Sequence, residues 1–286
     1  MILNKIRTNF FLSSMVFNND IERIKEQGNT FNYPIEFSSG LPYSKDAINE
    51  FIAYEGNKIV HNYFPAPEAP FVLNLASSMI ETREKSIQHC FQGIELSAQV
   101  GAPFYCAHAG FIVDPTVEEL GKKFTNVVAR DSDVKFQLFI DAIEQILAYA
   151  SKFNVDFYIE NNVLAPFNYT QTTLPFFCCE SQNILSVFDK IQHPRFGLLL
   201  DTAHLKVSCT TLNLSLEEEF LKIKDKIKAI HHSDNDGLKD NNQKISTDYW
   251  FLKYVKDFKS IPQVLEVKNL TNGEIEEQLK RLELTL

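Results

Sequence analysis

The order of hydrophobic and polar positions along the chain repeats one event eight times. Each time, a short apolar run rich in Val, Ile, Phe and Tyr precedes a longer stretch with helical spacing. Short, continuous apolar runs are typical of parallel strands that are buried on both faces. The pattern therefore predicts strands at residues 6–12, 33–38, 58–64, 103–109, 155–161, 195–201, 227–233 and 262–268.

Several of the intervening stretches place apolar residues at i, i+3, i+4 and i+7, which is the spacing of one helix face. The spacing predicts a helix from about 81 to 100, where Gly101 is placed to end it in the left-handed conformation. Its buried stripe is expected to contain Ile87, Cys90, Ile94 and Ser97. The next helix is expected to bury Phe136, Phe139, Ile140, Ile143, Ile146 and Leu147.

Strict alternation of strand and helix implies parallel strands joined by right-handed crossovers. Eight such units close a barrel, and (β/α)₈ barrels usually contain about 250 residues in one domain. We therefore predict an α/β protein with a single (β/α)₈ barrel domain over residues 1–286. An open, doubly wound sheet is the alternative, but no G-x-G-x-x-G turn follows the first predicted strand.

Polar and ionisable residues stand at the ends of the predicted strands, although an unpaired buried charge is costly. In a parallel barrel these carboxyl ends meet at one mouth, which is where barrel active sites occur. The residues in question, from predicted strands three to eight, are His61, His108, Glu160, Asp201, His231 and Glu266.

Four of these residues, Glu160, Asp201, His231 and Glu266, come from four successive strands. Three carboxylates and one imidazole suit a divalent ion such as Mn²⁺, Mg²⁺ or Co²⁺, and Zn²⁺ accepts the same set. Each residue alone is also compatible with a helix cap, a surface group or a hydrogen-bonded core histidine. Their joint occurrence at corresponding positions favours one bound divalent metal ion.

Other polar residues near these strand ends are expected to contact substrate, namely His61, His108 and Lys268, while His204, in the turn after strand six, can lean over the metal pocket without ligating. Metal ligation is the alternative for the first two. Because residues two apart in a strand point the same way, Lys268 should share the cavity with Glu266, unless it reaches solvent above the barrel. Asp234, three residues after His231, is placed to orient that imidazole or a neighbouring one.

Composition narrows the classes of partner. The formal net charge is −9, which disfavours general binding to nucleic acid. No apolar run approaches the roughly 18 residues of a membrane helix.

The five cysteines have no regular spacing, and we interpret the adjacent Cys178 and Cys179 as apolar packing rather than a redox or metal device. We expect a cytoplasmic protein. A homo-oligomer is possible, and the sequence does not determine the oligomeric state.

Six segments resemble the xylose-isomerase-like TIM barrel superfamily, and with the eightfold pattern they extend over nearly the whole chain. They are HNYFPAPEAPFVLNLAS (61–77), CAHAGF (106–111), YIENN (158–162), LLLDTAH (198–204), HHSDNDG (231–237) and LEVKN (265–269). This group includes sugar-phosphate isomerases and epimerases, a dehydratase and the endonuclease IV type of nuclease. The combination of D-x-x-H, H-x-x-D and a later Glu carries the resemblance.

The resemblance implies that Glu160 and Glu266 move protons on opposite faces of a substrate while they help to hold the metal, and that His204 contacts the substrate. The leading hypothesis is a metal-dependent isomerase or epimerase of a sugar or sugar phosphate, acting through a metal-stabilised enediolate on a small carbohydrate. A lyase or dehydratase, a phosphodiester hydrolase and a catalytically silent binding protein are the alternatives.

The chain departs from two branches of this superfamily. Where the nucleases carry Asp-x-His in the loop after strand seven, this sequence has Asp240 and Asn242. Where the ketose 3-epimerases carry an arginine, six residues after the strand-seven histidine, it has Gly237.

Overall fold

The computed structural model describes residues 9–125, 132–170 and 174–283. Eight parallel strands form one sheet in the order β3-β2-β1-β8-β7-β6-β5-β4. Each lies within or overlaps a strand predicted from the sequence, although residues 6–8 of the first prediction lie outside the described ranges. The strands are β1 Phe10–Ser13, β2 Ile35–Phe37, β3 Lys58–Val60, β4 Phe104–His108, β5 Asp156–Glu160, β6 Phe196–Asp201, β7 Ile227–His232 and β8 Gln263–Leu265.

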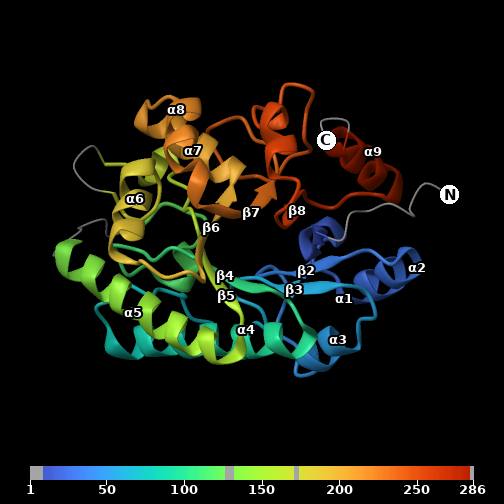
Figure 1. The fold of residues 1–286 in the computed structure, drawn as a ribbon, viewed down its shortest axis with the longest axis horizontal. Helices are drawn as coiled ribbons and strands as arrows, with labels where there is room; N and C mark the ends of the chain where they lie inside the picture. The colour runs from blue at the N-terminus through green and yellow to red at the C-terminus, as the bar shows by residue number, and fades with distance from the viewer. Residues whose placement is uncertain (1–8, 126–131, 171–173, 284–286) are drawn as a thin grey trace.

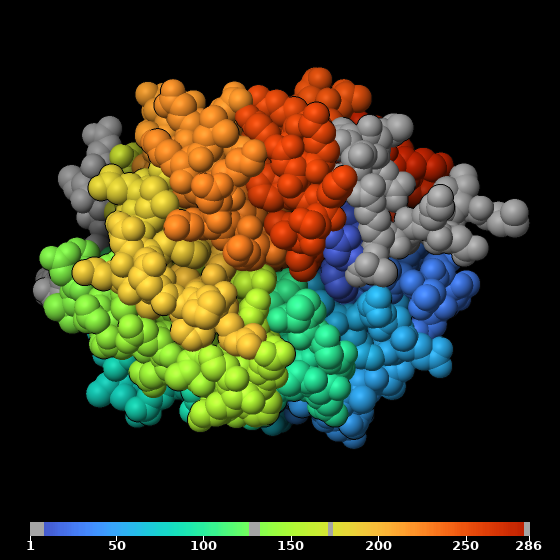
Figure 2. Space-filling model, viewed as in Figure 1, coloured from blue at the N-terminus to red at the C-terminus, as the bar shows by residue number. Residues whose placement is uncertain are grey.

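The sheet curls until its two ends meet. A parallel bridge pairs His61 with Cys106, and the Asn62 N–H donates to the Cys106 carbonyl at 2.8 Å, so the chain after β3 joins β4. On the other side β1 pairs with β8, which brings the first and last units together. Figure 2 shows their surfaces, blue and orange-red, side by side. The predicted (β/α)₈ barrel is confirmed, and the open-sheet alternative is wrong.

Helices surround the strands, with α4 and α5 along one side and α6, α7 and α8 together on another (Figure 1). The layer is least regular after β1, where a π-helical turn at Ile24–Gly28 separates two short helices, and after β7, where a 3-10 helix spans Leu252–Phe258. The α-helices are α1 Ile21–Arg23, α2 Asn29–Phe31, α3 Ala47–Ala53, α4 Ile80–Val100, α5 Ser132–Phe153, α6 Ser181–Lys190, α7 Thr202–Leu212, α8 Leu216–Ile223 and α9 Asn272–Glu283.

The two longest helices agree with the sequence pattern. All residues of the predicted stripe of α4 are buried, and α4 ends at Gly101, whose φ of 71° is the left-handed conformation expected of a helix-ending glycine. In α5 the predicted face is buried except for Phe136, which is partly exposed and packs against the core. These apolar faces cover β3, β4 and β5 and shield that side of the barrel from water.

The interior of the barrel is a small apolar cluster of its own. It contains at least one residue from β1 and from each of β3 to β8. Side chains from all of these strands can meet only around the barrel axis, so the cluster fills the inside of the barrel. Since side chains in a strand alternate, the residue two positions further on also points inward, one layer nearer the mouth. The interior residues used below are Ile59, Cys106, Tyr158, Leu199, Ala229 and Val264.

Candidate functional site

The layer above this apolar interior is polar. Two residues beyond each interior residue stand, in chain order, His61, His108, Glu160, Asp201, His231 and Glu266. All of them are buried except His108, which is partly exposed. The apolar floor therefore positions a ring of ionisable side chains from strands three to eight, as the sequence predicted. We call this ring, together with Glu36, His204 and Asp240 described below, the inner cluster.

Within this ring, Glu160, Asp201, His231 and Glu266 each offer one ligand atom, and these atoms all lie within 4.8 Å of one another. Asp201 is fully buried, and its Oδ2 has no hydrogen-bond partner. Burial raises the pKa of Asp201 well above its ordinary value, and Glu266 and Glu160 add to the rise against the opposing effect of His204. A divalent cation would satisfy the free oxygen and offset the packed carboxylates, so the predicted set fits a metal ion.

His61 and His108 both lie close to the Glu160 carboxylate. The Glu160 Oε2 atom lies 3.1 Å from His61 Nε2 and 3.5 Å from His108 Nε2, yet it makes no hydrogen bond. Burial lowers the pKa of His108 to about 4, against the opposing effect of Glu160. The sequence assigned both histidines to substrate contact. Each also belongs to a possible ligand group with Glu160, His61 together with Cys106 and His108 together with His204.

His204 stands at the start of α7 and connects two parts of the cluster. Its backbone N–H donates to Asp201 Oδ1 at 2.7 Å, because Asp201 caps that helix. Its ring contacts the Asn161 carbonyl at 2.9 Å through Nδ1 and Asp240 Oδ2 at 3.2 Å through Nε2. The second oxygen of Asp240 has no hydrogen-bond partner. His204 lines the cavity as predicted, and Asp240 joins the inner cluster from the loop after β7.

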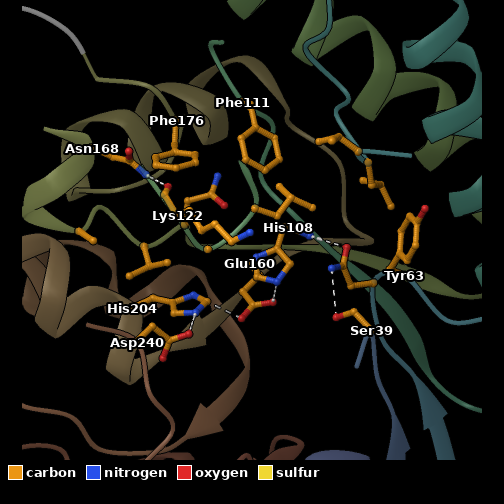
Figure 3. A pocket seen from close by; sticks show the side chains of 18 of the residues that line it. Ser39, Tyr63, His108, Phe111, Lys122, Glu160, Asn168, Phe176, His204 and Asp240 are labelled. Carbon is orange, nitrogen blue, oxygen red and sulfur yellow. Dashed lines mark hydrogen bonds and ion pairs between the residues drawn. The ribbon is translucent and has the colours of Figure 1, made fainter. Parts of the chain in front are cut away.

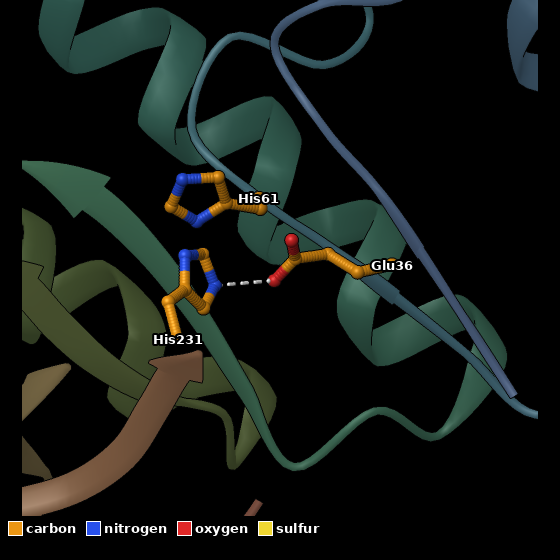
Figure 4. A group of neighbouring side chains, drawn as sticks. All are labelled: Glu36, His61 and His231. Carbon is orange, nitrogen blue, oxygen red and sulfur yellow. Dashed lines mark hydrogen bonds and ion pairs between the residues drawn. The ribbon is translucent and has the colours of Figure 1, made fainter. Parts of the chain in front are cut away.

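Glu36 on β2 orients His231, a role the sequence suggested for Asp234. His231 Nε2 lies 2.9 Å from Glu36 Oε2, and Nδ1 lies 3.1 Å from Glu266 Oε2 (Figure 4 shows Glu36, His61 and His231). Asp234 instead pairs with Lys206 Nζ at 2.7 Å, so that suggestion is wrong. Burial opposes a charge on the His231 imidazole, but Glu36 and Glu266 outweigh it and hold its pKa well above the ordinary value.

A sequence signal for Glu36 existed. It is the central residue of a three-residue strand whose neighbours, Ile35 and Phe37, are both fully buried in the outer core. A carboxylate between two such residues must point to the opposite side of the sheet, which here is the inside of the barrel. Because the strand has only three residues, this signal is short and does not stand out in the sequence.

Lys268 reaches solvent rather than the cavity. The strand ends at Leu265, so the alternation that would have aimed Lys268 along with Glu266 no longer applies. Its side chain is exposed, and its N–H donates to the Asn242 carbonyl at 3.1 Å. Burial raises the pKa of Asp240, but His204 lowers it, and the positive charge of Lys268 adds a smaller lowering effect. Of the two positions that the sequence left open for Lys268, the exposed one is confirmed, and contact with substrate stays a prediction.

A cavity of about 700 Å³ opens above the inner cluster. Figure 3 shows Glu160, His108, His204 and Asp240 at one end, with Phe111, Phe176 and Lys122 further along its wall. The wall is built by the segments that follow β3, β4 and β5, so it lies on the side where barrel active sites occur. Asn162, two residues after Glu160, also lines it and donates to the Phe177 carbonyl at 3.0 Å.

The adjacent cysteines take no part in this site. Cys178 and Cys179 are both free and fully buried, and Cys179 packs with Phe176 and Leu164 in an apolar cluster. Burial raises the pKa of both thiols, so neither is a reactive thiolate. This placement agrees with the packing interpretation.

A closed parallel barrel with an ionisable cluster at the carboxyl ends of its strands has the architecture of the barrel enzymes. The chain belongs to the xylose isomerase-like TIM barrel family, whose model matches residues 29–283. The resemblance recognised in the sequence is thereby confirmed. No curated protein matches the sequence.

Solved structures with the same fold include proteins of different named activities. A D-tagatose 3-epimerase-like protein is 17% identical with a TM-score of 0.73, over 97% of this chain and 98% of that chain. D-psicose 3-epimerase from Clostridium cellulolyticum H10 with D-tagatose is 12% identical, with a TM-score of 0.65 and coverage of 97% and 98%. A family 2 AP endonuclease from Brucella melitensis is 12% identical, with a TM-score of 0.62 and coverage of 93% and 95%. At such identities the similarity establishes the fold.

None of the described helices is both long and apolar enough to cross a membrane, in line with the sequence prediction.

Proposed function

We propose that the protein is a metal-dependent isomerase or epimerase that acts on a sugar or sugar derivative. The observation that carries the proposal is the group of four ligand atoms, within 4.8 Å of one another, at the floor of a cavity. Glu160, Asp201, His231 and Glu266 would hold the ion. When bound, it supplies positive charge that stabilises negative charge developing on substrate oxygens. Solved structures of D-psicose 3-epimerase, L-ribulose 3-epimerase and a D-tagatose 3-epimerase-like protein share the fold, which supports this reaction class.

Glu160 and Glu266 are the proton-transfer residues in this proposal. Burial raises the pKa of each carboxyl, but nearby imidazoles outweigh it, His108 and His61 for Glu160 and His231 for Glu266, and leave both lowered. Two ionised carboxylates are suited to take a proton from a carbon next to a carbonyl. Epimerisation results when the other glutamate, protonated from solvent, delivers a proton to the opposite face of the same carbon. Isomerisation results when a proton is delivered to the former carbonyl carbon while the neighbouring hydroxyl proton passes to the former carbonyl oxygen. His204 and His108 line the cavity beside them and are placed to contact hydroxyl groups.

The test is hydrogen exchange at carbon. Aldoses, ketoses and their phosphates would be incubated in D₂O with Mn²⁺-, Co²⁺- or Zn²⁺-loaded protein and followed by NMR. Deuterium should enter at the carbon beside the carbonyl, and Glu160→Gln and Glu266→Gln should each abolish the exchange. A wild-type protein that exchanges no substrate of the panel with any of these ions would contradict the proposal.

A second candidate is a metal-assisted phosphodiester hydrolase. His61, His108, His204 and Asp240 surround Glu160 and Asp201 with additional ligand atoms, among them the group formed by His108, Glu160 and His204. Such a group favours more than one ion, and paired ions stabilise both the attacking and the leaving oxygen of a phosphoester. The net charge of −9 opposes a nucleic-acid substrate.

Metal content separates the two candidates. Elemental analysis of the purified protein that finds one ion per chain would support the isomerase or epimerase. Three zinc ions per chain, with cleavage of an abasic DNA duplex, would replace it by the hydrolase.

A further inference from the structure

The cavity extends well beyond the inner cluster. Its volume of about 700 Å³ lies within the range of roughly 300–1,000 Å³ that is typical of sites for drug-sized ligands, and one free monosaccharide leaves much of it unfilled. The acidic residues that line it, Glu160, Asp240 and Glu266, all belong to the inner cluster. The remainder of the described lining is largely apolar and aromatic, which a small polar sugar does not require.

Two aromatic walls face this remainder. On one side Tyr63 and Phe71, after β3, pack with ring centroids 5.3 Å apart, and the Phe71 N–H donates to the Tyr63 hydroxyl at 2.7 Å. On the other side Phe111 and Phe176 form an antiparallel bridge, with centroids 5.3 Å apart. Phe124 joins them at 5.5 Å from Phe176. Because these rings already pack against one another, the walls are preformed for a flat or apolar group.

Lysines accompany the second wall. Apart from the inner cluster, the charged side chains in the described lining are Lys122, Lys123 and Lys239. The first two are exposed, and among described residues neither ammonium group has a hydrogen bond or an ion pair. In a chain of net charge −9, unpaired lysines beside a cavity favour an anionic ligand.

The lysine segment is held in place against the aromatic wall. Asn168, which is buried, donates through Nδ2 to the Lys122 carbonyl at 2.9 Å and accepts at Oδ1 from the Phe124 N–H at 2.9 Å. Its neighbour Phe167 lines the cavity with 39% of its surface exposed, so one ring remains free for stacking at the same place. Positive charge and an open aromatic ring therefore occur together, away from the candidate metal ligands.

We propose that the substrate is a sugar joined through a diphosphate to an aromatic base, a nucleoside diphosphate sugar. The inference rests on the proposed function, because it places the sugar against Glu160, His108 and His204. The diphosphate lies near Lys122 and Lys123, and the base stacks on Phe167. Phosphates suit lysine ammonium groups, and every base offers a face for aromatic stacking. This substrate class accounts for the volume, the apolar walls and the unpaired lysines together.

The test is calorimetric titration of UDP and ADP into the full-length protein. Metal is first removed with a chelator, so that no ion can hold the phosphates. Both nucleotides should bind at least tenfold more tightly than inorganic pyrophosphate. The double substitution K122A/K123A should weaken this binding at least about tenfold, since hydrogen bonds to charged groups contribute about 1.5–3 kcal/mol each. The matched double substitution K45A/K280A removes two exposed lysines elsewhere and should change nothing.

Phe167→Ala tests the base separately. Loss of a stacked base costs about 1–3 kcal/mol, so binding should weaken about tenfold or more. Phe153→Ala is the control, because Phe153 is also 39% exposed but lies on α5. Nucleotide binding no tighter than that of pyrophosphate, or equal binding by the Lys122/Lys123 and Lys45/Lys280 variants, would overturn the inference.

Failure of this inference differs from failure of the proposed function. A protein that exchanges carbon-bound hydrogen in free sugars but binds neither nucleotide retains the isomerase or epimerase function and loses the nucleotide subsite. A protein that binds UDP through Lys122, Lys123 and Phe167 but exchanges hydrogen in neither free sugars nor UDP-sugars retains the subsite and loses the proposed reaction.

Discussion

His231 and His232 are consecutive residues of β7, both fully buried, and they occupy opposite environments. His231 points into the barrel, where Glu36, Glu160 and Glu266 lie within 3.6 Å of its ring nitrogens. His232 points outward, where Nδ1 lies 3.0 Å from the Tyr249 hydroxyl and Nε2 lies 2.9 Å from Gln263 Oε1.

The consequences for charge are opposite. Burial lowers the pKa of His232 to about 4, since its partners are neutral. The carboxylates beside His231 overcome the same burial and raise its pKa. Each ring nitrogen of His232 has a hydrogen-bond partner. In the inner cluster, by contrast, several carboxylate oxygens have none. Burial alone therefore does not mark a functional histidine, but charged partners with unfilled bonding capacity do.

The largest expected effect is loss of metal from the inner cluster. Glu160→Gln should reduce metal affinity by more than the roughly 10–100-fold that outer-shell substitutions cause, because it changes a ligand itself. Competition with a fluorescent chelator measures the change.

Glu219→Gln is the matched control for Glu160→Gln. Glu219 is also a buried glutamate, but it accepts from the Ser181 N–H at 2.7 Å in the helical layer. That variant should keep its metal affinity. If both variants bound metal as the wild type does, the inner cluster would not be the metal site.

Glu36→Gln should come next in size. It preserves the shape of the side chain but removes the charge that faces His231 Nε2, so we expect metal affinity to fall about 10–100-fold. The same chelator competition measures it, and the thermal stability of the metal-free variant shows whether the fold is intact. Unchanged affinity would mean that Glu36 does not position His231.

Gln263→Ala makes the corresponding change on the outer side. It leaves His232 Nε2 buried without its partner, which costs about 1–3 kcal/mol of unfolding free energy. Denaturant titration measures this loss, and metal affinity should not change. A fall in metal affinity like that of Glu36→Gln would abolish the distinction between the two sides of β7.

The smallest effect concerns pH and a second outer histidine. Burial lowers the pKa of His89 to about 4, while the unfolded chain takes up its proton near 6.5. The unfolded state therefore binds more protons between these values, and the free energy of unfolding falls as pH drops through this window. Between pH 6.5 and 5.5 the contribution of His89 should be about 1 kcal/mol. His89→Gln should flatten the pH profile by that amount, and an unchanged slope would contradict the assignment.

Much of the fold was predictable because it depends on local pattern. The helix face of Ile87, Cys90 and Ile94 and the helix end at Gly101 follow from spacing and backbone conformation, and both are confirmed. The convergence of Glu160, Asp201, His231 and Glu266 was predictable as well, since the carboxyl ends of parallel strands must meet. The choice between the cavity and solvent for Lys268 was not predictable, because the alternation ends with the strand at Leu265.

By itself, the sequence determined the eight-unit barrel and the ring of ionisable residues at its mouth, because both arise from periodicities along the chain. Only the tertiary structure decided that Glu36, rather than Asp234, orients His231, since that contact joins residues 195 positions apart. It alone also joined Lys122 to Asn168, the chain neighbour of Phe167. Such contacts depend on where loops cross the barrel mouth, and no periodic pattern encodes that position.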